Sequence, residues 1–167
     1  MSGVKFAEGL NILPVLKPHD LVAATHRTSF IDLDLANWVS FLVNFGDVTT
    51  GAGATCDSVV ITVEATSIAS SAGAIKIPFK YRLSNAIATG GWGAITAGTS
   101  DGVELSCSDI GSVSMLIDVD PAVFPALGAT YRWIGVCLVP SSTTALNCGA
   151  QAFLETRYPG NSIPSST

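Results

Sequence analysis

Apolar and polar residues alternate along much of this chain with a period of two. The clearest segment is 74–83, where large apolar residues fall on one side: Ile75, Ile77, Phe79, Tyr81 and Leu83. The other side carries Lys76, Pro78, Lys80 and Arg82. Because successive side chains of a β-strand point to opposite faces, this pattern predicts a strand with one dry face and one basic face.

The same alternation predicts further strands along the chain, at 27–35, 38–45, 58–66, 103–107, 112–119, 130–139 and 151–158. Clusters of Gly, Ser, Thr, Asn and Pro separate these segments and predict loops, and Asp101-Gly102 predicts a tight turn. No segment has the period of a convincing amphipathic helix. We therefore predict an all-β fold, an antiparallel jelly-roll-like or Greek-key β-sandwich of about eight strands.

The inward positions of these strands should form one hydrophobic core. The residues that we expect in strands are Ile61, Val63, Ile77, Phe79, Tyr81, Leu105, Ile117, Trp133, Val136 and Leu138. Trp133 lies in the nearly all-apolar segment 130–139, which is typical of a central strand, so we interpret it as a core residue.

The length of 167 residues predicts one sandwich domain, 21–158, between an N-terminal arm, 1–20, and a C-terminal tail, 159–167. The arm is too apolar to remain in water, and its candidate interface residues are Phe6, Leu10, Ile12, Leu13, Val15 and Leu16. Pro14 and Pro18 prevent a long helix, so the arm should run extended. It could lie on a neighbour's sheet edge or in a groove of an assembly, or be the first strand of its own sandwich.

Charge is scarce in this sequence. Only 13% of the residues are Asp, Glu, Lys or Arg, against roughly a quarter in an average soluble domain. The net charge of −5 argues against a nucleic-acid partner, because phosphate binding needs a concentrated basic surface. We recognise no signal peptide or membrane-spanning segment and expect a soluble protein. A soluble surface with so few charges indicates an assembly subunit, and we expect a homo-oligomer, with a trimer as the first expectation.

The cysteines do not form a recognisable metal or disulfide motif. Cys107 and Cys137 fall on predicted inward faces, so we expect both to be buried free thiols. Cys56 and Cys148 lie in loop-like segments, and a bridge between them stays open. No CxxC or Cys/His spacing predicts a zinc site.

Candidate catalytic groups are few. His19 and His26 precede the first confident strand and belong to no motif with Ser, Cys or a carboxylate. The same-face pairs Asp32/Asp34 and Asp118/Asp120 could bind calcium or act as acid and base, but neither has the flanking oxygen ligands that calcium needs. We interpret both pairs as solvated. The expectation is a protein without enzymatic activity, metal or cofactor.

Two surface features are candidates for binding. Trp92, in a glycine-rich GGWG loop, could anchor a protein interface, serve as a stacking platform for a sugar, or fold back as a lid on the sandwich. Lys76, Lys80 and Arg82 could contact an acidic protein surface or simply form a solvated face.

The order of these features resembles that of small β-sandwich virion proteins of tailed bacteriophages, above all capsid decoration (cement) and related head proteins. The resemblance rests on an apolar arm, HRTSFIDLDLANWVSFLVNFG, DSVVITVEAT, AIKIPFKYRLS, a GGWG loop and a late YRWIGVCLV strand. It implies a non-enzymatic virion structural protein that binds and stabilises a shell of major capsid protein. It also implies a symmetric oligomer, assembly in the host cytoplasm and no cofactor.

Two alternatives belong to other functional classes. The first is a carbohydrate-binding β-sandwich module or a phage tail adhesin, with Trp92 and either Tyr81 or Tyr158 as stacking platforms. The second is an all-β hydrolase, which would need a pair of carboxylates in one cleft. The sequence alone does not locate such a pair.

Overall fold

The structure, a computed structural model, describes residues 10–21, 24–34, 36–48, 57–84, 91–120, 124, 127–128, 130–141 and 146–156. Its strands form two antiparallel sheets. Sheet A has the order β1 (Asn11–Leu21), β12 (Leu146–Thr156), β4 (Ala36–Val48), β10 (Ser114–Val119), β7 (Phe79–Leu83) and β8 (Thr96–Gly98). Sheet B is built around two long strands that pair with each other, β11 (Trp133–Pro140) and β5 (Ser58–Thr66). On its other side β11 pairs with β2 (His26–Arg27) and β3 (Ile31–Asp32). On its other side β5 pairs with β6 (Ile75–Ile77) and β9 (Val103–Ser106). The helical turn α2 (Cys107–Ile110) follows β9.

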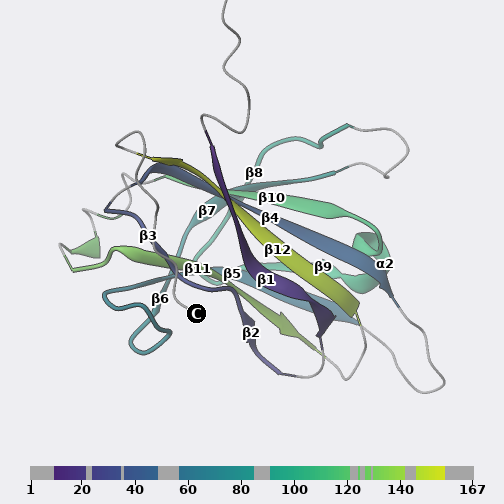
Figure 1. Cartoon of the computed structure of the whole chain (residues 1–167). Coiled ribbons are helices and arrows are strands. Elements are labelled where there is room, and N and C mark those ends of the chain that lie inside the picture. The colour runs from purple at the N-terminus through teal and green to yellow at the C-terminus, as the bar shows by residue number, and fades with distance from the viewer. Residues whose placement is uncertain are drawn as a thin grey trace, which may run out of the picture.

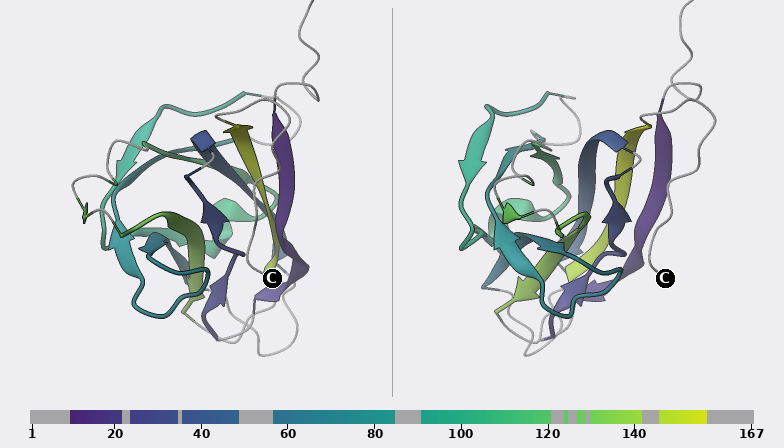
Figure 2. Two further views of the ribbon diagram at one scale, coloured as in Figure 1. Left: turned by 60° about the vertical axis from the view of Figure 1, so that its left-hand side comes forward. Right: turned by 90° about the vertical axis from the view of Figure 1, so that its left-hand side faces the viewer.

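The chain passes between the two sheets at most of its connections (Figures 1 and 2). The run β1-β12-β4-β10 in sheet A lies against the run of β2 and β3, β11, β5 and β6 in sheet B, which is the strand order of a jelly roll. The predicted all-β sandwich is confirmed. The described residues contain twelve strands rather than about eight, because segments expected as single strands are divided and short strands occur at the sheet margins.

Alternate residues of the two sheets fill the space between them. Sheet A contributes Phe41 and Ile117 and sheet B contributes Ile61 and Leu138, and all four are fully buried. Burial of each such side chain stabilises the fold by about 1.5–3 kcal/mol.

The core differs from the prediction at its margin. Tyr81 and Leu105 are half-buried and pack against it. The prediction that Trp133 belongs to the core is wrong. Its neighbour Ile134 takes the inward position on β11, and Trp133 lies half-buried on the opposite face, with the Arg132 Cζ 5.7 Å from its ring centroid.

The segment expected as one strand at 74–83 is divided at Pro78. β6 pairs with β5 in sheet B, whereas β7 pairs with β10 and β8 in sheet A. Pro78 has no N–H to donate to a ladder and marks the corner between the two sheets. Ile77 and Phe79, on either side of it, are both buried, so the inward alternation continues around the corner.

The described part of the predicted arm is the edge strand β1. It is extended, as expected, and it pairs with β12 of the same chain, which is the first-strand arrangement considered above. The register shifts between Pro14 and Leu16 and again between Leu16 and His19. Residues 1–9 lie outside the described residues, as does the predicted tail.

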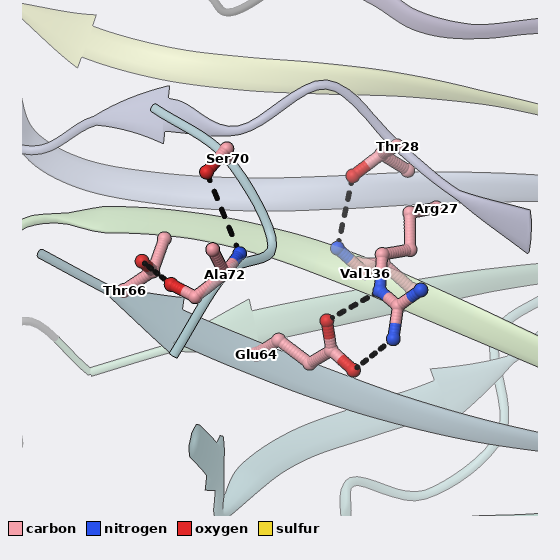
Figure 3. Close-up of polar contacts among 7 residues, drawn as sticks. All are labelled: Arg27, Thr28, Glu64, Thr66, Ser70, Ala72 and Val136. Carbon is pink, nitrogen blue, oxygen red and sulfur yellow. Dashed lines mark hydrogen bonds and ion pairs between the residues drawn. The ribbon is translucent and has the colours of Figure 1, made fainter. Parts of the chain in front are cut away.

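Several polar side chains on the outer face of sheet B are buried, and Figure 3 shows some of their contacts. Glu64 is 5% exposed, and Arg27 donates to it from Nε at 2.8 Å and from Nη2 at 3.3 Å. The hydrogen bond to Glu64 raises the pKa of the Arg27 guanidinium. Beside this pair the Val136 amide donates to Thr28 Oγ1 at 2.9 Å. A Cβ on Gly135 would lie 3.2 Å from that hydroxyl oxygen, so glycine permits this close approach.

The turn at 67–73, which the sequence predicts, is closed by side-chain hydrogen bonds. Thr66 Oγ1 donates to the Ala72 carbonyl at 3.3 Å, and the Ala72 amide donates to Ser70 Oγ at 3.4 Å (Figure 3). Local bonds of this kind favour a turn over continued strand pairing.

One predicted solvated carboxylate is buried instead. Asp32 is 3% exposed and pairs with Arg132 Nη2, while Arg132 Nη1 lies 2.8 Å from Asp34 Oδ2. The interpretation of Asp32 as solvated is therefore wrong. The cause is the long-range pairing of β3 with β11, which brings the carboxylate beside the guanidinium.

The cysteines differ from the prediction at Cys107, which is disulfide-bonded rather than a free thiol. The pairing of β9 with β5 places Cys107 beside Asp57, whose carbonyl accepts from the Cys107 amide at 3.2 Å. Cys137 is a buried free thiol, as expected. Cys148, which was expected in a loop, is a buried free thiol of β12, and this excludes a Cys56–Cys148 bridge. Burial raises the pKa of Cys137 to about 11 and that of Cys148 to about 12.

The core predicts a large difference between two substitutions of the same type. Ile77→Asp should lower the free energy of unfolding by more than about 3 kcal/mol, since it buries an unpaired carboxylate. Ile68, on the 67–73 turn, is 50% exposed, and Ile68→Asp should change it by less than about 0.5 kcal/mol. Urea unfolding followed by circular dichroism measures both, and equal effects would contradict the assigned core.

The Arg27–Glu64 pair predicts non-additive effects. Arg27→Met should destabilise the fold by about 2 kcal/mol, because it leaves Glu64 buried without its cation; the value lies below that of a fully buried pair since the Arg27 side chain is 39% exposed. The double variant Arg27→Met/Glu64→Leu should recover most of this loss. A double-mutant cycle from urea unfolding measures the coupling, and strictly additive effects would show that the pair is not formed.

The thiols predict a simple titration. Ellman's reagent attacks thiolates, and at pH 8 the raised pKa values keep Cys137 and Cys148 protonated as well as buried. The native protein should therefore react slowly. In guanidinium chloride two thiols should react, and reduction before the assay should raise the number to four. Four reactive thiols without reduction would contradict the disulfide at Cys107.

Candidate functional site

The outer face of sheet A carries the residues that alternate with its core residues. One cross-strand row follows the register from β1 to β8 through Ile12, Phe153, Ser40, Asp118, Lys80 and Ala97. The neighbouring row runs through Pro14, Gln151, Leu42, Leu116 and Arg82. Apart from Ser40, each of these residues is exposed or half-buried. We call the surface formed by the two rows the A face.

Hydrogen bonds between strands hold the polar residues of the A face in place. Ser40 is fully buried, and its hydroxyl donates to Asp118 Oδ1 on the adjacent strand. Further along the same strands, Ser114 Oγ donates to Asn44 Oδ1 at 2.8 Å. Lys80 lies directly opposite Asp118 on the other side, although no ion pair joins them among the described contacts. The position of the Asp118 carboxylate is thus set by Ser40.

A groove of about 720 Å³ lies on the A face where β10, β7 and β8 meet. Its charged lining consists of two cations and two carboxylates, Lys80, Arg82, Asp118 and Asp120. Its other lining residues include Trp38, Pro78, Phe79, Leu116 and Val119. This size, and an apolar lining with a few polar groups, are typical of small-ligand sites.

Trp92 lies beside this groove and is 41% exposed. A bridge between Trp92 and Ser84 and a hydrogen bond from the Gly93 amide to the Leu83 carbonyl, 2.8 Å long, hold its loop against β7. The Arg82 Cζ lies 5.9 Å from the Trp92 ring centroid, a cation–π contact. Ile95, in the same segment, is 62% exposed.

The residues predicted for an interface are divided by the fold. Trp92, Arg82 and Lys80 come together, whereas Lys76 lies on sheet B opposite Glu64. Of the arm residues, Ile12 is 44% exposed and Leu10 is half-buried. The others pack against the chain's own core: Leu13, Val15 and Leu16. Phe6 lies outside the described residues.

The aromatic platforms named for carbohydrate binding have different positions. Tyr81 is half-buried and packs against the core, 6.1 Å from Phe79 between ring centroids, so its ring faces the interior. Tyr158 lies outside the described residues. Trp92 keeps part of its ring exposed.

The two histidines lie side by side and form a pair. His19 Nε2 lies 2.9 Å from His26 Nδ1, and His19 Nδ1 lies 2.8 Å from the Lys17 carbonyl oxygen. These bonds join the end of β1 to β2. Within the described ranges no three His, Cys, Asp or Glu residues gather as a metal site would require, and no described helix has the length and apolarity to cross a membrane.

Sequence reasoning missed the groove. Trp38 and the pair Asp118/Asp120 lie far apart in the chain and meet only because β10 pairs with β4, so that two carboxylates share one groove. The alternation predicts that these residues point outward, but it does not predict that they lie close together. A scan against protein-family profiles, a search of curated proteins and a search of solved structures give no match to this chain.

Proposed function

We propose that this chain is a non-enzymatic virion structural protein that binds and stabilises a capsid shell, as decoration proteins do. The observation that carries the proposal is the segment from Trp92 to Ile95, which exposes two large apolar side chains beside the edge strand β8. Arg82 adjoins it, and a cluster of Trp, Arg and aliphatic residues is typical of the residues that contribute most to protein–protein binding.

Composition and fold are compatible with this function. Only 13% of the residues in the chain are charged. A surface with so few charges favours contact with other proteins over exposure to water. The jelly roll is an architecture of viral capsid proteins, but it also occurs in lectins and cupins, so it does not select among functions. The virion assignment itself rests on the resemblance to bacteriophage decoration proteins.

The positions of the exposed apolar residues favour a ring of identical subunits. Ile12 lies on the edge strand β1, and Trp92 and Ile95 lie beside β8 at the opposite edge of sheet A. A contact between unlike edges of successive copies is heterologous, and such contacts form a ring where the rotation from copy to copy closes and an open filament where it does not. A trimer remains the first expectation. If assembly takes place in the host cytoplasm, the disulfide at Cys107 must form late, because cytosolic thiols are kept reduced.

Removal of the exposed apolar segment should weaken association. The double variant Trp92→Ala/Ile95→Ser should retain the β-sheet circular dichroism spectrum but bind expanded capsids at least about tenfold more weakly in co-sedimentation. It should also shift analytical ultracentrifugation toward monomer. The control Ile68→Ser removes an apolar side chain that is 50% exposed on the 67–73 turn and should change neither result. Wild-type binding by the double variant would reject this surface as the anchor.

A further inference from the structure

We propose that the groove on the A face binds a neutral saccharide through Trp38, Lys80, Asp118 and Asp120. This inference goes beyond the proposed function and does not depend on it. The groove has the volume of a small-ligand site, about 720 Å³, and it combines one half-buried indole with charged groups of both signs.

The charges in the groove favour an uncharged ligand. Lys80 and Arg82 balance Asp118 and Asp120, so neither an anion nor a cation gains a net electrostatic advantage there. A ligand rich in hydroxyl groups uses both kinds of residue, since each hydroxyl donates to a carboxylate and accepts from an ammonium or guanidinium group. Neutral sugars have this chemistry.

The carboxylate of Asp118 is held in position for binding. Asp118 Oδ1 accepts a hydrogen bond from the buried Ser40 hydroxyl, and Asp118 Oδ2 accepts none from the described residues. Lys80 lies directly across the ladder from it. Lys80 and Asp118 thus provide a donor and an acceptor on adjacent strands, and Ser40 on a third strand fixes the acceptor. Groups arranged in this way lose little conformational entropy when a ligand binds.

Trp38 provides the apolar contact. It is half-buried and lies on the same face of β4 as Ser40, two residues away. The antiparallel register of β4 and β10, continued by one residue, sets Asp120 opposite Trp38. An indole face stacks on the C–H face of a sugar ring while neighbouring polar groups bind the hydroxyls at its edge.

The position of the groove favours a saccharide over a peptide. An extended peptide is usually bound by an open strand edge, through backbone hydrogen bonds. The strands β4, β10 and β7 are each paired on both sides, so their backbone groups are already used in the sheet. Recognition over these three strands, which carry Trp38 and the charged residues of the groove, therefore depends on side chains.

Titration calorimetry with neutral hexasaccharides of glucose, mannose and N-acetylglucosamine tests the proposal. At least one should bind the intact protein and change its tryptophan fluorescence. Trp38→Ala should weaken that binding at least about tenfold, and so should Lys80→Ala. Lys80 is exposed and Trp38 is half-buried on the outer face of its sheet, so both variants should keep the β-sheet circular dichroism spectrum. Asp118→Asn should weaken binding as well. Trp133→Ala, which truncates a half-buried indole on the outer face of sheet B, is the matched control and should bind like the wild type.

Several results would overturn the proposal. These are no binding of any hexasaccharide, full binding by Trp38→Ala, or an equal loss in Trp133→Ala and Trp38→Ala. Cleavage of the hexasaccharides, measured as new reducing ends, would show that the groove does more than bind and would overturn its assignment as a binding site only. Because capsid binding is tested at Trp92 and Ile95 and saccharide binding at Trp38 and Lys80, the two proposals can fail separately.

Discussion

The fold depends on the continuation of one inward alternation around the corner at Pro78. Ile77 and Phe79 belong to different sheets, yet both enter the same core. This requires the chain to turn while successive side chains keep alternating between the two faces. Proline suits the corner because it has no N–H that would be left unpaired. The turn sends β7 to sheet A, where it lies beside β10. That neighbourhood sets Lys80 directly opposite Asp118 in the groove.

The two outer faces serve different purposes. On sheet B two carboxylates are paired with arginines, Glu64 with Arg27 and Asp32 with Arg132, and both carboxylates are almost completely buried. Such pairs fix the positions of the strands but leave few groups for a ligand. On sheet A, Lys80 and Asp118 lie opposite each other, and no ion pair joins them among the described contacts. An apolar groove that carries a few charged groups of both signs is better suited to binding a ligand.

Local sequence patterns predict the local structure well and the contacts between distant segments poorly. Period-two alternation predicts most of the long strands and the inward positions of Ile61, Ile77 and Ile117, because side-chain direction is a property of the strand itself. It cannot show that Asp32 meets Arg132, or that Trp38 and Asp118 share a groove, because those depend on which strands pair and in what register. The disulfide at Cys107 has the same origin. Trp133 was misassigned because both faces of β11 read as apolar.

The edge strand β1 limits how copies of this protein can join. A strand at the margin of a sheet presents unpaired amides that can recruit the same strand of another molecule, and repeated pairing leads to fibres. Pro14 and Pro18 offer no amide, and the register shifts of β1 fall at and beside them. The opposite margin, β8, is only three residues long. Both margins therefore resist the open-ended edge-to-edge pairing that leads to fibres.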